Sequence, residues 1–322
     1  MKICLVGSIL RHTVHSDAGT YSGWGGMTES AVAPFAGLLD KDSTLHFIGS
    51  VGKEDIDEVR EFYKKHYPFV DASGVHINPT GTDHHEGNKH FVTRKVQVEP
   101  TTYEHIAPHI KNADVVIFNF GNIDDIDPEA IKKVKENSKA HVYVDVHRKP
   151  FGADEHGRMY ARGWQGWEKY LQYADTVQMD KSECEALFGK KMDTVSDAVA
   201  SAEKILNTGA GHVLITLGSK GVLFAHKTPA SQYLLAPTMP CAPVDTTGAG
   251  DAFAAGYLVN LHEGASLPHA IKMGSLMAAI TCEFIGYMKN INREIVAKRM
   301  MAQFEVIPID PDKETHAHTS LV

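Results

Sequence analysis

The chain alternates short apolar segments with longer amphipathic ones. The short segments are rich in β-branched and aliphatic residues and predict buried strands at 2–6, 45–48, 115–118, 141–144, 176–179 and 213–217. Helical spacing between them predicts helices at 55–66, 128–137, 165–173, 181–188 and 196–207. Strands that alternate with helices form a mostly parallel sheet covered on both faces. The pattern therefore predicts an α/β fold with a mostly parallel sheet that helices cover on both faces.

The last third of the chain has a different pattern. Two short segments, 221–225 and 232–236, predict antiparallel strands. Three helices are predicted after them, at 251–262, 267–285 and 292–304. Residues 310–322 are polar and predict a frayed end.

Two segments interrupt the alternation of strands and helices. Residues 13–24 are rich in Ser, Gly and Thr, and residues 82–100 contain an alternating run at 90–98 after a turn at 86–88. We interpret both as strands that project from a single domain spanning 1–322 and form a small β-strand lid over a site at the strand ends. The alternative is a pair of irregular surface loops.

Composition narrows the classes of protein. The 322 residues carry a net charge of −8, which argues against a general binder of nucleic acid or of an acidic membrane. The four cysteines are scattered and form no CxxC pair, which suits a reducing compartment without a zinc cluster. No apolar run is long enough to cross a bilayer. The expectation is a soluble cytoplasmic protein.

One short segment carries the strongest chemical signal. Asp251 follows Gly248, Ala249 and Gly250 at the predicted start of a helix. The first backbone N–H groups of a helix lack partners and carry partial positive charge, and glycines let them converge on one point. Such an anion hole suits a phosphate, and the adjacent carboxylate can take the proton of an attacking hydroxyl. The alternative is an ordinary helix start that is capped by a threonine.

The segment 245–253, DTTGAGDAF, resembles the C-terminal signature of the ribokinase-like (PfkB-type) carbohydrate kinases. The resemblance extends through FIGSVG at 47–52, EGNKHFV at 86–92, residues 174–183 and VLITLGSKG at 213–221. It implies a ribokinase-like α/β domain, in which a doubly wound, mostly parallel sheet is flanked by helices, with a small β-strand lid. It also implies transfer of the γ-phosphate of ATP, with Mg²⁺, to a hydroxyl of a sugar or nucleoside. A monovalent cation and a homodimer formed through the lid are compatible with the same resemblance.

The resemblance assigns roles to individual residues. The acid of the motif would be the general base, and the three small residues before it would form the anion hole. The residues on the nucleotide side would be Thr216, Gly218, Gly221, Asp180 and Glu183. Glu183 would organise Mg²⁺ through water, although Asp180 and Glu183 also have the spacing of an ordinary capping box.

The substrate side departs from the family pattern at two positions. Gly25 and Gly26 keep the family's paired glycines, but Ser30 stands where an Asn that touches the sugar is expected. After the first strand, His12 occupies the place of an Asp that accepts hydrogen bonds from two substrate hydroxyls. An imidazole cannot replace the paired acceptors of a carboxylate.

Two consequences of these departures remain open in the sequence. Arg11 and His12 together suggest a substrate with negative charge, such as a sugar acid or a sugar phosphate; the alternative is that Asp17 reaches in from the lid and supplies the carboxylate. Pro34 falls inside the helix expected after Ser30 and would bend it, unless it lies in the first turn.

The leading hypothesis is an ATP-dependent kinase that acts on a sugar or sugar derivative. A nucleoside kinase of the same fold is the first alternative, since Trp24, Phe91 and Tyr103 could line a slot for a base. The second alternative is a ligand-binding protein that keeps the fold without useful turnover. Asp251 argues against it, because a protein without catalysis has no chemical reason to keep that acid.

Overall fold

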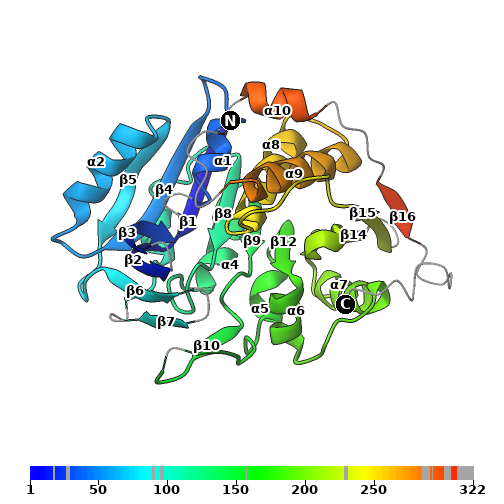
Figure 1. Ribbon diagram of the computed structural model, residues 1–322, viewed down its shortest axis with the longest axis horizontal. Coiled ribbons are helices and arrows are strands. Elements are labelled where there is room, and N and C mark those ends of the chain that lie inside the picture. Colours follow the sequence, from blue (N-terminus) through cyan, green and yellow to red (C-terminus); the bar gives the residue numbers. More distant parts are fainter. Residues whose placement is uncertain are drawn as a thin grey trace. The chain divides into compact units, whose positions relative to one another are not determined.

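Strands and helices alternate through most of the chain in a computed structural model (Figure 1). The described residues are 1–16, 19–26, 30–88, 91–94, 98–156, 158–227, 231–284, 291, 293–300 and 306–309. Two compact units divide the chain: unit 1 consists of Met1–Glu29 and Lys41–Gln165, and unit 2 of Ser30–Asp40 and Gly166–Val322. The single domain over residues 1–322 stays a prediction.

Unit 1 is built on a parallel sheet of buried strands. The strand order is β9-β8-β1-β4-β5, and neighbouring strands are parallel throughout. The bounds are β1 Lys2–Gly7, β4 Thr44–Val51, β5 Val70–Ile77, β8 Val115–Asn119 and β9 His141–Asp145. β8 is buried along its whole length. Strands covered on both faces are continuous apolar runs, which is why the sequence reveals them.

The chain winds outward from β1 in both directions. It passes from β1 to β4 and β5 on one side, and later to β8 and β9 on the other. This is the doubly wound order that the sequence predicts. The reversal creates a topological switch point between β1 and β8, and ligands of open α/β sheets bind outside the carboxyl ends of the strands at such a point.

Three helices accompany this sheet among the described residues of unit 1. They are α2 Ile56–His66, α3 Tyr103–Ile106 and α4 Glu129–Asn137. α2 lies along β5 (Figure 1) and buries Val59 and Tyr63. The Tyr63 ring is 5.2 Å from the Phe47 ring of β4, so the helix packs onto the apolar face of the sheet.

β5 is a strand that the apolar pattern does not reveal. It lies at the end of the strand order and is only partly buried, so polar residues are tolerated along it. Gly74 follows a shift in the pairing register with β4. A Cβ at Gly74 would lie 2.7 Å from the carbonyl oxygen of Phe47. The glycine is thus explained by a close backbone approach.

A four-stranded sheet in unit 1 contains the two segments predicted to form a lid. Its order is β3-β2-β6-β7, with bounds β2 Ile9–Ser16, β3 Gly19–Gly26, β6 Asp83–Asn88 and β7 Phe91–Arg94. The predicted turn at 86–88 is wrong, because these residues belong to β6 and pair with β7. Residues 89–90, between β6 and β7, lie outside the described residues. The function of this sheet as a lid stays a prediction. A separate hairpin joins β10 Phe151–Ala153 to β11 Met159–Ala161.

Unit 2 carries a mixed sheet. β12 Thr176–Asp180 and β13 His212–Thr216 are parallel. From β13 onward the pairing is antiparallel, through β14 Val222–Lys227, β15 Ser231–Ala236 and β16 Ile307–Ile309. The antiparallel strands predicted in the last third are therefore confirmed, whereas β16 was not predicted.

The helices of unit 2 largely follow the predicted ranges. They are α1 Ala33–Ala36, α5 Glu168–Leu171, α6 Lys181–Phe188, α7 Val195–Leu206, α8 Ala249–His262, α9 Leu267–Cys282 and α10 Arg293–Arg299. α5 is shorter than predicted because Gly166, with φ +71°, is not helical. Pro34 lies in the first turn of α1, where its missing N–H costs no hydrogen bond. No helix of the described residues is long and apolar enough to span a bilayer.

A pair of stacked histidines makes the stability of unit 1 depend on pH. The His76 ring of β5 lies 3.9 Å from the His105 ring of α3, at an interplanar angle of 9°. Burial and then the charge of His105 lower the pKa of His76 from 6.5 to about 4. Between pH 6.5 and about pH 4, His76 is therefore protonated in the unfolded chain but neutral in the folded chain. The free energy of unfolding falls as the pH falls through this window.

We expect this group alone to cost roughly 3 kcal/mol of unfolding free energy between pH 7 and pH 4. His76→Phe keeps an aromatic ring in the stack but does not titrate, so its stability should depend less on pH than that of the wild type. Urea unfolding of both proteins at pH 7.5, 6 and 5 measures the difference. Parallel curves for the two proteins would contradict the assignment to His76.

Candidate active site

The motif that the sequence singles out forms the N-terminus of α8. Gly248 precedes the helix and has φ +79°, a left-handed conformation that favours glycine. Asp251 lies in the first turn. The N–H of Ala252 donates to the carbonyl oxygen of Gly248 at 2.9 Å, so the helix begins immediately after the glycine. At such a terminus the helix dipole and the early N–H groups favour a negative charge.

Contacts behind the motif hold it in place. Gln178 on β12 is 2% exposed and donates from Nε2 to the carbonyl oxygen of Gly250 at 3.0 Å. In the preceding loop, Thr247 donates from N and from Oγ1 to Asp245 Oδ1, at 3.0 and 2.8 Å, which makes an Asx-turn. The N–H of Asp245 donates to the carbonyl oxygen of Cys282, at 3.2 Å. Hydrogen bonds to β12 and to Cys282 therefore hold the first turn of α8 and the loop before it against the rest of unit 2.

Ser30 lies beside this motif within unit 2. A Cβ at Gly248 would be 3.3 Å from Ser30 Cβ. The fold thus brings together a position predicted to bind substrate and one predicted to form the anion hole. The residues just before Ser30, 27–29, lie outside the described residues.

Asp180 and Glu183 form a complete capping box at the start of α6. Asp180 Oδ1 accepts a hydrogen bond from the N–H of Glu183, and Glu183 Oε2 accepts one from the N–H of Asp180, both at 2.8 Å. Glu183 is 8% exposed. The capping alternative is confirmed, and the Mg²⁺ role of Glu183 stays a prediction beside it.

Three of the five residues predicted on the nucleotide side lie in or next to the turn between β13 and β14. Thr216 ends β13, and Gly218 and Gly221 have φ +58° and +98°. A Cβ at Gly221 would overlap the carbonyl oxygen of Ala236 on β15, at 1.9 Å. Thr238 donates from Oγ1 to the carbonyl oxygen of Gly218, at 3.0 Å. Both glycines are thus required by the backbone, whether or not a nucleotide binds here.

His12 and Gly25 lie against each other on the four-stranded sheet of unit 1. His12 is 9% exposed, and a Cβ at Gly25 would be 2.0 Å from its Nδ1. Gly25 therefore makes room for the imidazole. Gly26 pairs with Ile9 at the first position of the β2–β3 ladder. Burial and the neighbouring His85 lower the pKa of His12, which favours the neutral imidazole.

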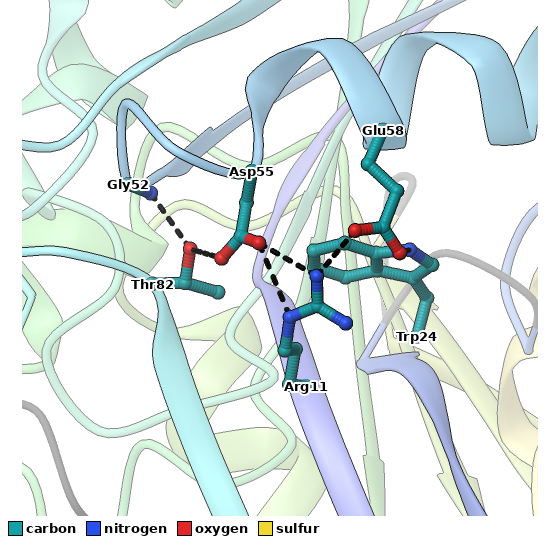
Figure 2. A network of polar contacts seen from close by, with 6 residues as sticks. All are labelled: Arg11, Trp24, Gly52, Asp55, Glu58 and Thr82. Atoms are coloured by element: carbon teal, nitrogen blue, oxygen red, sulfur yellow. Dashed lines mark hydrogen bonds and ion pairs between the residues drawn. The ribbon is translucent and has the colours of Figure 1, made fainter.

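Arg11, also on β2, belongs to a polar network with side chains of α2 and its N-terminus (Figure 2). Its Nη2 lies 2.6 Å from Asp55 Oδ1 and 2.5 Å from Glu58 Oε2. Its guanidinium carbon lies 4.2 Å from the centre of the Trp24 ring. Thr82 donates from Oγ1 to Asp55 Oδ2 at 2.5 Å. Burial alone would raise the pKa of Asp55, but the hydrogen bonds from Arg11 and Thr82 lower it below its ordinary value.

This network weakens the prediction that Arg11 binds an anionic substrate. Two carboxylates already offset its charge, and a stacked indole holds the guanidinium in place. Consecutive residues of a strand point to opposite faces, so Arg11 and His12 do not face the same ligand. Asp17, the alternative source of a carboxylate, lies outside the described residues.

Sequence reasoning missed a buried polar cluster in unit 1. Asp83 and His85 on β6 are 1% and 8% exposed, and Asn122 and Asp125, after β8, are 4% and 5% exposed. A signal was present in the polar residues Asn122, Asp124 and Asp125, which come shortly after a buried strand of a predicted parallel sheet. The partner strand β6 gave no such signal, because its pairing with β2 joins segments far apart in the sequence.

Comparison with known proteins gives a consistent picture. A family model described as pfkB family carbohydrate kinase matches residues 31–292. The chain is 27% identical to the adenosine kinase of Saccharomyces cerevisiae over 277 residues, which cover 81% of this chain and 78% of that protein. It is 37% identical to the 1-phosphofructokinase of Haloferax volcanii over 100 residues, which cover 31% of this chain and 32% of that protein. The chain thus aligns with about a third of the latter relative's length.

Solved structures establish the fold. The ribokinase from Thermotoga maritima superimposes with a TM-score of 0.72 at 24% identity, covering 94% of this chain and 100% of that one. A pyrophosphate-dependent kinase of the ribokinase family superimposes with the same score at 19% identity, covering 92% and 99%. The fold is ribokinase-like, with a large, mostly parallel sheet flanked by helices, as the sequence predicts.

Proposed function

This chain belongs to the pfkB family of carbohydrate kinases, and on that premise we propose that it transfers the γ-phosphate of ATP to a hydroxyl of a sugar or sugar derivative. The observation that carries the proposal is the N-terminus of α8, where an acid stands in the first helical turn directly after a left-handed glycine. In this arrangement Asp251 is the general base, and the backbone at Gly248, Ala249 and Gly250 forms the anion hole for the transferred phosphoryl group.

The nucleotide is assigned to residues of unit 2. Thr216, Gly218 and Gly221 lie at one turn, and no atom lies within 4 Å of an added Cβ at Gly218, which leaves room for a ligand close to the backbone there. Asp180 and Glu183 offer carboxylate oxygens, the ligand type that Mg²⁺ prefers. Mg²⁺, when bound, would offset negative charge on the phosphates.

The acceptor is a sugar or, as the second candidate, a nucleoside. Support for the nucleoside comes from the alignment with an adenosine kinase over 81% of this chain. We keep the assignment of His12, Gly25, Gly26 and Ser30 to the substrate site, as the sequence predicts. We do not propose that Arg11 binds an anionic substrate, because Asp55 and Glu58 already offset its charge. A monovalent cation, a homodimer and a cytoplasmic location stay predictions.

Product formation with two phosphoryl donors tests the proposal. ATP and pyrophosphate are each offered with D-ribose, D-fructose, fructose 6-phosphate, myo-inositol and adenosine, and the phosphorylated product is detected by mass spectrometry. The expected result is one preferred acceptor, with ATP as the donor. Transfer from pyrophosphate alone would overturn the choice of donor, and binding of an acceptor without any transfer would favour the ligand-binding alternative.

Glu183→Gln separates the capping role of this residue from its proposed role with Mg²⁺. A glutamine completes a capping box as a glutamate does, so the unfolding free energy should change by less than about 0.5 kcal/mol. The loss of charge should raise the Mg²⁺ concentration needed for half-maximal activity by about tenfold or more. Activity is measured across a Mg²⁺ titration, with Glu185→Gln, an acid of the same helix paired with Lys191, as the control. An unchanged Mg²⁺ dependence would leave Glu183 as a cap only.

A further inference from the structure

The carboxyl ends of β1 and β8 meet at the switch point of unit 1. Ser8 follows β1, and its hydroxyl donates to Asp125 Oδ2 in the segment after β8. The N–H of Asn122 donates to the same oxygen at 3.0 Å. Lys149 is 6% exposed and donates from Nζ to the carbonyl oxygen of Ile123 at 2.6 Å. The segment is thus fixed from several sides at the place where a doubly wound sheet binds its ligand.

This fixed segment holds one side chain against the four-stranded sheet. Asn122 Nδ2 donates to Asp83 Oδ2 on β6. His85 Nε2 lies 3.3 Å from the same carboxylate oxygen and 3.4 Å from Asn122 Nδ2. The Asn122 amide nitrogen only donates and the Asp83 carboxylate only accepts, so one of the two engages His85 Nε2 in either tautomer of the ring. The other ring nitrogen, Nδ1, takes no part in these contacts.

The strand register adds His12 to the same face. His12 on β2 is paired with His85 on β6, and Leu10 with Asp83. Side chains directly opposite each other in neighbouring strands share a face, so His12, Asp83 and His85 lie on one side of the sheet and Arg11 and His84 on the other. This face therefore combines two imidazoles, a carboxylate and an amide, all less than a tenth exposed.

We propose that His12 and His85 bind a hydroxyl group of the substrate, and that Asp83 and Asn122 are positioning residues that hold His85 for this purpose. The proposal rests on the proposed function and names the residues that would recognise its acceptor. The substrate hydroxyl, which can both donate and accept, forms a hydrogen bond with His85 Nδ1. His12 on β2 and His85 on β6 would each contact the substrate. Together the two rings provide two contacts to the substrate, which a single imidazole in place of the family's carboxylate cannot.

The binding of each candidate compound, compared with that of its monodeoxy analogues, tests the proposal without relying on turnover. Calorimetry in the absence of any phosphoryl donor compares D-ribose, D-fructose, myo-inositol and adenosine, each with its monodeoxy analogues. For the compound that binds, the wild type should bind one deoxy analogue at least about tenfold more weakly, since the hydrogen bond between the hydroxyl and His85 Nδ1 is then lost. In His85→Phe the parent compound should bind about tenfold more weakly, and the penalty for the missing hydroxyl should fall below about threefold.

The chain offers a matched control for this comparison. His84→Phe makes the same change at the preceding residue of β6, on the opposite face. This variant should keep the wild-type loss of affinity for the deoxy analogue. Asp83→Asn should lower the penalty in the same direction as His85→Phe, because it acts through His85. Circular dichroism and thermal unfolding verify that each variant is folded.

Two results would overturn the proposal. One is an unchanged penalty for the deoxy analogue in a folded His85→Phe protein. The other is a wild-type protein that binds none of these hydroxyl compounds. Failure of the proposed function gives a different result. The variants would then change the binding of the parent and deoxy compounds as expected, while neither ATP nor pyrophosphate supports phosphoryl transfer.

Discussion

Asp251→Asn is expected to reduce phosphoryl transfer by roughly 10²- to 10⁴-fold, the range that a general base contributes. The amide keeps the size and the first-turn position of the carboxylate but cannot take a proton from the attacking hydroxyl. The affinity for ATP should change little, because the anion hole is made by the backbone, which the substitution leaves in place. Steady-state ADP formation and equilibrium binding of ATP measure the two quantities separately.

Asp245→Asn is the matched control for this substitution. Asp245 lies in the loop before the same helix, and its Oδ1 accepts two hydrogen bonds from Thr247. An asparagine makes the same Asx-turn, so this variant should keep most of the activity. If Asp251→Asn retains more than a tenth of the wild-type rate, or if both variants lose activity alike, Asp251 is not the general base.

Gly221→Ala is expected to have the largest effect on stability, a loss of roughly 3–5 kcal/mol of unfolding free energy. Gly221 has φ +98° and ψ −141°, a conformation that is nearly restricted to glycine. The added methyl group would also overlap the carbonyl oxygen of Ala236, a backbone atom that cannot rotate away. The turn would therefore have to open, and β14 would separate from β15. Urea unfolding at neutral pH measures the change.

Gly218→Ala provides the comparison within the same turn. Gly218 has φ +58°, but no atom lies within 4 Å of an added Cβ. Only the cost of a left-handed alanine remains, roughly 1–2 kcal/mol. The difference between the two variants isolates the effect of the overlap at Gly221. Equal losses would show that backbone conformation alone accounts for both glycines.

The central strands and the start of α8 could be read from the sequence for local reasons. A strand covered on both faces must be apolar throughout, and β8 is buried at every residue. α6 has the predicted bounds because its ends are set by local residues. Asp180 and Glu183 cap its N-terminus, and Gly189, in a left-handed conformation, ends it. Likewise, Gly248 and Asp251 are close in the chain, so their chemistry is local.

The substrate side could be read only in part. His12 and Gly25 were found from a motif, but their mutual fit depends on the β2–β3 ladder. Arg11 was predicted to meet an anionic ligand, yet Asp55 and Glu58, far along the chain, offset its charge. Nothing in the local sequence distinguishes an arginine that awaits a ligand from one that already has carboxylate partners.

The sequence by itself determined the family, the positions of the central buried strands and the acid at the start of α8, because each depends on residues close together in the chain. Only the tertiary structure decided which polar groups meet. It placed Ser30 beside Gly248, and it brought Asp83 and His85 to Asn122 at the switch point between β1 and β8. The physical reason is that sheet register and crossover connections, which join distant segments, set these contacts, and no local propensity encodes them.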